Sequence, residues 1–119
     1  MLVWVGIGLL GGVGALARFL LDAVVSERAG PRFPWGTFVV NVTGTFALGV
    51  LVGAEVHGDA FMLAGTATLG SYTTFSTWMF ETHRLGEQGE RAGMGLNVVM
   101  SLAVGIGAAA LGRVIGGVL

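Results

Sequence analysis

Hydroxyl-bearing side chains are concentrated at positions 71–77, SYTTFST, where every residue except Phe75 carries a hydroxyl group. The surrounding segment, residues 60–82, is otherwise built mainly from Phe, Met, Leu, Ala, Gly and Trp. Polar groups inside such an apolar segment are costly in lipid, and they usually face the interior of a helix bundle or a water-filled path. The run therefore indicates a functional stretch rather than a lipid-facing surface.

Asn41 is a second polar position, near the middle of the apolar stretch 35–54. Thr37 lies one helical turn before it and Thr45 one turn after it, so the three side chains share one helix face. Threonines in this arrangement are typical of a seam that joins two helices. The amide of Asn41 offers two N–H donors, more than a seam requires, so it faces either a helix contact or a conduction path.

Charged residues occur near the ends of the apolar stretches. Arg18 either extends its guanidinium to the membrane interface or is buried and holds an anion. Glu81 and Arg113 also lie at the ends of stretches and have a similar ambiguity between an exposed charge at the interface and a buried functional charge.

Four apolar stretches position these side chains. The chain has 119 residues, of which 54% are hydrophobic and only 11% charged, far fewer charges than a soluble domain carries. The stretches cover about residues 2–21, 35–54, 60–82 and 92–118, each long enough to cross a bilayer as a helix. Their short connections require consecutive helices to run antiparallel. We expect an all-α membrane protein, a single four-helix domain over residues 1–119 in the cell membrane.

The composition of the third stretch disfavours one continuous helix, because Gly70 is followed by bulky Tyr72 and by branched Thr73 and Thr74. A break at 70–74 would free backbone carbonyls, which are tolerated in a membrane only where they are buried in protein or line a cavity. Inward-facing carbonyls favour a cation. Phe75 and Trp78 would share one face of the helix that resumes.

Several classes of function are disfavoured. The chain has no cysteine and no clustered acid and base groups, which argues against an enzyme, and no basic patch that suggests nucleic acid. Residues 15–17, ALA, resemble a signal-peptide cleavage site. The first stretch lacks a basic leader and its apolar residues resume after Arg18, so we expect it to be a retained span.

Three segments resemble, in order, motifs of the small fluoride channels of the Fluc or CrcB family. They are GGVGALARF (11–19), PWGTFVVNVTGTFALG (34–49) and GSYTTFSTWMFE (70–81). The third is the most specific, and the resemblance covers essentially the whole chain. It implies an antiparallel dimer with two pores that passively exports fluoride from the cytoplasm, with a structural sodium ion at the dimer centre.

The resemblance also implies residue roles. Phe75 and Trp78 would be the two aromatic side chains of the pore, and Asn41, with Thr37 on its helix face, would donate hydrogen bonds to fluoride. Gly70 and Thr73 would supply backbone carbonyls to sodium. The remaining predicted pore residues are Ser76, Thr77 and Ser101 on a polar track, Arg18, and Glu81 as a vestibule carboxylate.

Three positions depart from the family pattern. Trp78 stands where Phe is usual; it also presents ring edges, but it is larger and adds an indole N–H. Ser71 replaces the second glycine of the break, a change that a carbonyl-lined cation site can tolerate. Asn97 stands where Tyr is common, so the fourth stretch, which also contains Ser101, departs from the family pattern at this position.

The arginines are distributed unevenly between the two sides of the membrane. Arg28, Arg32, Arg84 and Arg91 lie on one side and only Arg113 lies near the other, which by the positive-inside rule places the termini outside. Two partners remain possible: an identical chain inserted in the opposite orientation, or an oppositely biased relative.

A small four-helix exporter of cationic drugs is the alternative function. Its chemistry needs a membrane-embedded carboxylate that exchanges protons for a cation. The first two stretches contain no Asp or Glu, and Glu81 lies at the end of the third, which disfavours this alternative.

Overall fold

The protein is all-helical over the described residues, as predicted. The computed structural model describes the whole chain except the side chain of Ser76, so the predicted role of that hydroxyl lies outside the described groups. The elements in chain order are α1 (Leu2–Ala29), α2 (Trp35–Gly53), α3 (Gly58–Phe61), η1 (Met62–Leu69), α4 (Gly70–Tyr72), α5 (Phe75–Glu87) and α6 (Arg91–Gly117).

Helix α1 continues to Ala29, well beyond the apolar stretch that ends near residue 21. Residues 22–29 contain neither proline nor glycine, and Ser26 Oγ donates to Asp22 Oδ1 at 3.0 Å within the helix. The helix ends at Gly30, whose φ of 85° is accessible to glycine at little cost, and Pro31 follows. Hydropathy therefore located the apolar part of this helix but not its end.

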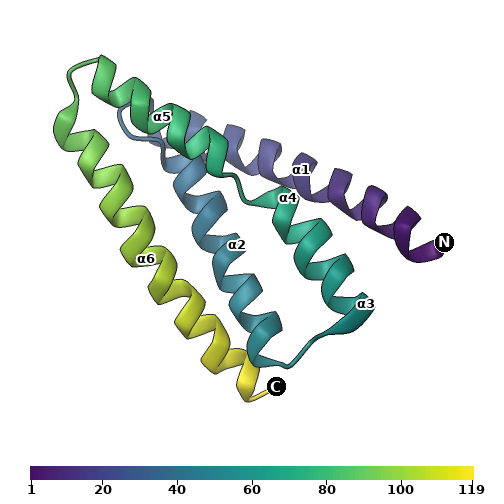
Figure 1. Ribbon diagram of the computed structural model, residues 1–119. Helices are drawn as coiled ribbons and strands as arrows, with labels where there is room; N and C mark the ends of the chain where they lie inside the picture. Colours follow the sequence, from purple (N-terminus) through teal and green to yellow (C-terminus); the bar gives the residue numbers. More distant parts are fainter.

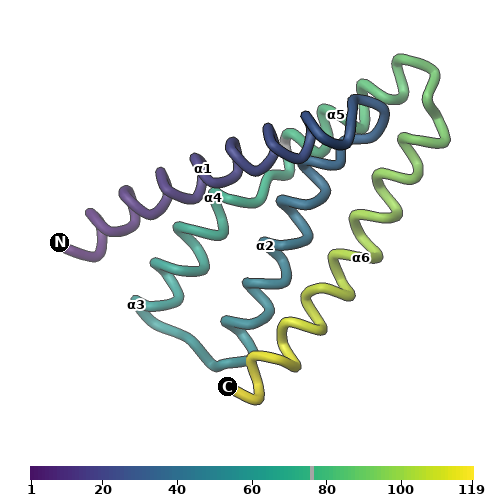
Figure 2. Tube along the Cα trace, turned by 180° about the vertical axis from the view of Figure 1, so that it is seen from behind, coloured from purple at the N-terminus to yellow at the C-terminus, as the bar shows by residue number. Residues whose placement is uncertain are grey.

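Helices α2 and α6 form the most intimate contact of the fold. Figures 1 and 2 show α2 between α6 and the segment that runs from α3 to α4. Four glycines line the α2–α6 contact: Gly49 and Gly53 on α2, and Gly112 and Gly116 on α6. A methyl group at Gly112 would overlap the Phe46 carbonyl oxygen, so the backbones approach as closely as they do because these side chains are absent.

The third apolar stretch is a broken helix. Helices α3, η1 and α4 run in succession to Tyr72, after which Thr73 (φ −75°, ψ 155°) and Thr74 (φ −145°, ψ 118°) are extended, and α5 begins at Phe75. The predicted break at 70–74 is confirmed. Within η1 the helix widens to π geometry, a rare form that occurs often at functional sites and that the sequence did not indicate.

Most large apolar side chains point outward. Among the described residues, the buried hydrophobic side chains are Val40, Ala67 and Leu85, whereas large ones such as Phe19 and Ile106 are exposed. Three helices, α1, α2 and α6, are long and apolar enough to cross a membrane. The third predicted span, residues 60–82, is divided among the shorter helices α3, η1, α4 and α5.

Candidate functional site

The side chain of Asn41 pairs with the break in the third segment. Asn41 Nδ2 donates to the Thr74 carbonyl at 3.0 Å, and the Thr74 N–H donates to Asn41 Oδ1 at 2.8 Å. The amide thus replaces the two backbone partners that Thr74 would have in a continuous helix. One N–H of Asn41 remains for another partner. The sequence predicted a polar role for Asn41 but not this pairing.

The break diverts the N–H donors from the two carbonyls predicted to bind a cation. In a continuous α-helix, Gly70 O would accept from Thr74 N and Thr73 O from Thr77 N. The Thr74 N–H donates instead to Asn41, and the Thr77 N–H donates to Thr74 Oγ1 at 3.4 Å. The carbonyls of Gly70 and Thr73 are thereby released from the donors that would normally occupy them.

A cavity of about 290 Å³ lies beside the break, between α2, α5 and α6. Its lining includes six of the predicted site residues: Asn41, Gly70, Thr73, Phe75, Trp78 and Ser101. The Oγ atom of Ser101 is buried and has no hydrogen-bond partner among the described groups, which leaves its O–H available to a ligand.

Phe75 and Trp78 meet at the start of α5. Their ring centroids are 5.6 Å apart and the planes are inclined by 66°, so one ring directs its edge toward the other. Both rings line the cavity, yet the Phe75 side chain is 70% exposed. The cavity is therefore open on the side of Phe75 in the single chain.

A second polar contact lies one turn from Asn41 along α2. Thr37 is almost fully buried, and its Oγ1 donates to Glu81 Oε1 at 2.5 Å. Thr77 lies between this pair and the cavity along α5, where its Oγ1 accepts from Thr74 Oγ1 at 3.2 Å. Thr37, Thr77 and Glu81 thus lie outside the cavity lining, toward the end of α5 that leads to Glu87.

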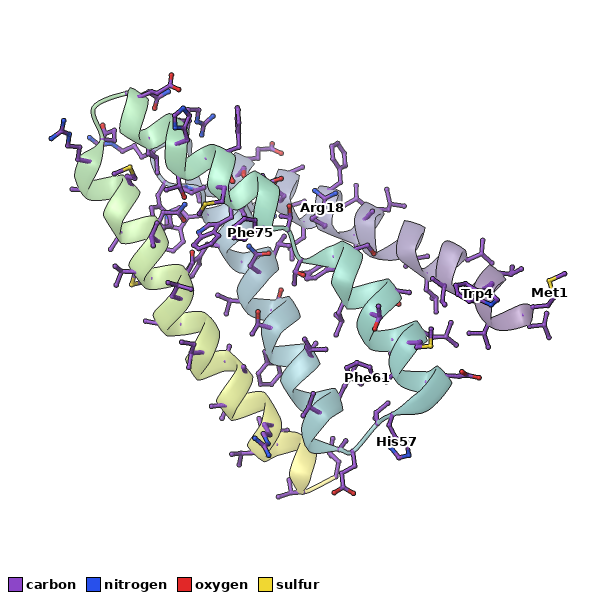
Figure 3. All side chains as sticks on the ribbon, viewed as in Figure 1. Met1, Trp4, Arg18, His57, Phe61 and Phe75 are labelled. Atoms are coloured by element: carbon purple, nitrogen blue, oxygen red, sulfur yellow. The ribbon has the colours of Figure 1, made fainter. Side chains whose placement is uncertain are left out.

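Arg18 does not line the cavity either. Its Nε donates to the Ser71 carbonyl at 3.4 Å, beside the carbonyl-terminated end of α4, where positive charge is favourable. Figure 3 shows Arg18 on α1 and Phe75 at the start of α5, and α1 packs against α4, which ends at the break. The structure therefore places Arg18 at the break rather than in the cavity.

Two further polar residues, Asn97 on α6 and Thr82 on α5, connect these helices outside the cavity lining. Asn97 is fully buried, and its Nδ2 donates to Thr82 Oγ1 at 2.8 Å. The sequence singled out Asn97 as a departure from a family pattern and gave Thr82 no role. An asparagine on an otherwise apolar helix was the available signal.

Comparisons with known proteins identify the family. The family described as "CrcB-like protein, Camphor Resistance (CrcB)" matches residues 5–113. The chain belongs to this family. A CrcB-like relative from Mycobacterium tuberculosis (strain ATCC 25618 / H37Rv), named "Fluoride-specific ion channel FluC 2", is 48% identical over 111 residues, which cover 93% of this chain and 88% of the relative.

Relatives from other organisms carry similar names. "Fluoride-specific ion channel FluC 2" of Mycolicibacterium paratuberculosis (strain ATCC BAA-968 / K-10) is 50% identical over 93% of this chain and 91% of its own length. "Fluoride-specific ion channel FluC" of Acidobacterium capsulatum is 44% identical over 96% of this chain and 94% of its own length. With its three membrane-capable helices, this CrcB-like chain is a multi-pass membrane protein.

Proposed function

We propose that this chain is a fluoride-selective channel that lets fluoride leave the cytoplasm passively. The observation that carries the proposal is the cavity beside the helix break, which brings together Asn41, Ser101 and the rings of Phe75 and Trp78. The choice of fluoride as the transported ion comes from the names of the relatives. The function is therefore transport of an ion rather than catalysis.

The cavity chemistry suits a small anion. Fluoride holds its water strongly, so a narrow path must replace that water with hydrogen-bond donors. The second N–H of Asn41 and the O–H of Ser101 are such donors, and the edges of aromatic rings carry partial positive charge. The described lining contains no carboxylate, which is the group that a proton-coupled cation exporter would need.

The contact between Thr37 and Glu81 would mark one mouth of the path. Thr37 lies on the same face of α2 as Asn41, one turn closer to the start of the helix. Thr77 would carry the ion between this mouth and the cavity, while Arg18 would act at the break by holding the end of α4.

We further propose that the chain has four spans and works as an antiparallel dimer with two pores. The exposure of Phe75 supports this proposal, because an aromatic residue that lines a pore needs a second surface to close it. The partner is either an identical chain in the opposite orientation or an oppositely oriented relative.

A structural sodium ion would lie on the dimer axis. The residues fit this role because a sodium ion is bound by oxygen atoms and the carbonyls of Gly70 and Thr73 have lost their helical donors. The bound ion would supply positive charge close to the anion path and would join the two chains at the break.

Growth of cells without a fluoride exporter tests the function. Hydrogen fluoride crosses membranes as a neutral acid and releases fluoride in the cytoplasm, so only an anion pathway relieves the accumulation. Expression of this chain should restore growth in sodium fluoride and should lower cytoplasmic fluoride. Normal membrane expression without any fall in cytoplasmic fluoride would contradict the proposal.

A further inference from the structure

We infer that Asn97 and Thr82 are positioning residues that fix the ring of Trp78 so that it presents carbon edges, not its N–H, to the anion path. The inference rests on the proposed channel function and deepens it. Trp78 is half-buried and lines the cavity with Phe75. An indole ring could face the cavity with either its N–H or its carbon edges, and the two would bind an anion differently.

The first part of the evidence is the partner of the indole nitrogen. Trp78 Nε1 donates to the backbone carbonyl of Asn97 on α6 at 3.4 Å. Asn97 does not line the cavity, so this N–H is directed to the protein. In this same conformation the Trp78 ring contacts the ring of Phe75, with 5.6 Å between the centroids. Trp78 thereby takes the role that a phenylalanine could have at this position.

The second part is a return connection from Asn97 to the same residue. The Asn97 side chain donates to Thr82 Oγ1 at 2.8 Å, and Thr82 Oγ1 donates to the Trp78 carbonyl at 2.7 Å. The hydroxyl thus accepts one bond and donates one, which uses its donor and one acceptor site. Trp78, Asn97 and Thr82 form a closed set, which we term the Trp78 lock, with the ring held at one end and its backbone at the other.

The third part is the cost of keeping an asparagine at this position. Asn97 is 0% exposed, and its Oδ1 has no hydrogen-bond partner among the described groups. A buried acceptor without a partner costs about 1–3 kcal/mol, which an apolar side chain of similar size would avoid. The hydrogen bond that Asn97 donates to Thr82 explains why a polar side chain is present at this buried position.

Substitutions at Thr82 test the Trp78 lock. Thr82→Val removes the hydroxyl but keeps the shape, and Thr82→Ser keeps the hydroxyl as the matched control. In liposomes, Thr82→Val should lower fluoride efflux by up to about tenfold and Thr82→Ser should stay near the parent, since loss of a buried hydrogen bond corresponds to about that factor. In the Trp78→Phe background the same Thr82→Val change should have little effect, because the ring has no N–H to direct.

Fluorescence of Trp78 gives an independent readout. The chain has three tryptophans, so Trp4→Phe and Trp35→Phe leave Trp78 as the single probe. In the purified dimer or monomer, Thr82→Val and Asn97→Leu should each lower the anisotropy of Trp78 emission, and Thr82→Ser should not.

The outcomes separate this inference from the proposed function. Equal loss of efflux from Thr82→Val in both backgrounds, or loss in neither, would overturn the Trp78 lock, as would unchanged anisotropy. Absence of fluoride efflux from the parent chain would contradict the channel, while the anisotropy would still decide whether the ring is held by Thr82 and Asn97.

Discussion

At the scale of single residues, Asn41 links two parts of the site. Its amide holds Thr74 through both backbone groups, one N–H is left outside these two bonds, and the residue lines the cavity. The same pairing withdraws the Thr74 N–H from Gly70, whose carbonyl is proposed to bind sodium. One side chain therefore affects both the anion path and the proposed cation site.

Asn41→Leu should lower stability as well as flux. The leucine leaves the N–H and C=O of Thr74 without their partners in an apolar surrounding, which costs about 1–3 kcal/mol per group. We expect a lower midpoint of thermal unfolding in detergent and fluoride efflux close to background. A variant as stable as the parent would show that the pairing with Thr74 does not hold the break.

Phe75 supplies a test restricted to the pore. Phe75→Ile removes the aromatic edge while keeping an apolar side chain, so fluoride efflux should fall by at least about tenfold, the equivalent of 1.4 kcal/mol at the barrier, while the oligomer persists. Phe80→Ile is the matched control, since Phe80 is on the same helix, is 65% exposed and is not part of the cavity lining. Equal effects of the two substitutions, or none, would remove Phe75 from the path.

At the scale of elements, the site depends on how closely α2 and α6 approach. Asn41 is on α2 and Ser101 on α6, so the width of the cavity follows from the packing of these two helices. That packing is set by glycines at which a methyl group would overlap the backbone of the facing helix. The packing of α2 against α6 therefore sets the distance between Asn41 and Ser101 across the cavity.

Gly112→Ala tests this dependence. The added methyl group would meet the Phe46 carbonyl oxygen, so α6 must move away from α2. We expect a loss of stability of about 1–3 kcal/mol, typical of overpacking, seen as a lower unfolding midpoint. Gly107→Ala on the same helix meets no atom within 4 Å and should leave the midpoint unchanged or raise it slightly. Equal shifts for the two variants would contradict the close contact.

Sequence patterns predicted the features that depend on local chemistry. Gly70 with the bulky residues after it indicated the break, and apolar stretches indicated the helices. The pairing of Asn41 with Thr74 and of Trp78 with Asn97 was not predictable, because residues far apart in the chain meet only through the register of packed helices. The same applies to Arg18. The sequence left two interpretations, an interfacial guanidinium or a buried anion site, and the structure shows neither: its Nε donates to the Ser71 carbonyl. The roles of the site residues in conduction remain predictions.

At the scale of the whole molecule, the single chain leaves a large apolar surface and an open cavity. Phe75 lines the cavity but is mostly exposed, and the arginine distribution favours one orientation of the chain. The proposed antiparallel pair needs a second chain that is inserted in the opposite orientation, and the surface of that chain would close the cavity. The whole-molecule proposal therefore depends on topology as much as on contacts.

Accessibility of tagged termini tests the identity of the partner. If the chain pairs with itself, expression alone should yield termini on both sides of the membrane and a dimer that conducts. A single orientation together with a monomer that does not conduct would exclude the homodimer and point to an oppositely oriented relative.

Ion selectivity of the purified protein tests the central claim most directly. The chain is reconstituted in liposomes loaded with equal fluoride and chloride, and ion-selective electrodes follow both anions after the membrane potential is clamped with an ionophore. We predict rapid fluoride efflux and chloride efflux no faster than from protein-free liposomes. Equal release of both anions, or no fluoride release from a sample shown to be dimeric, would contradict a fluoride-selective path beside the helix break.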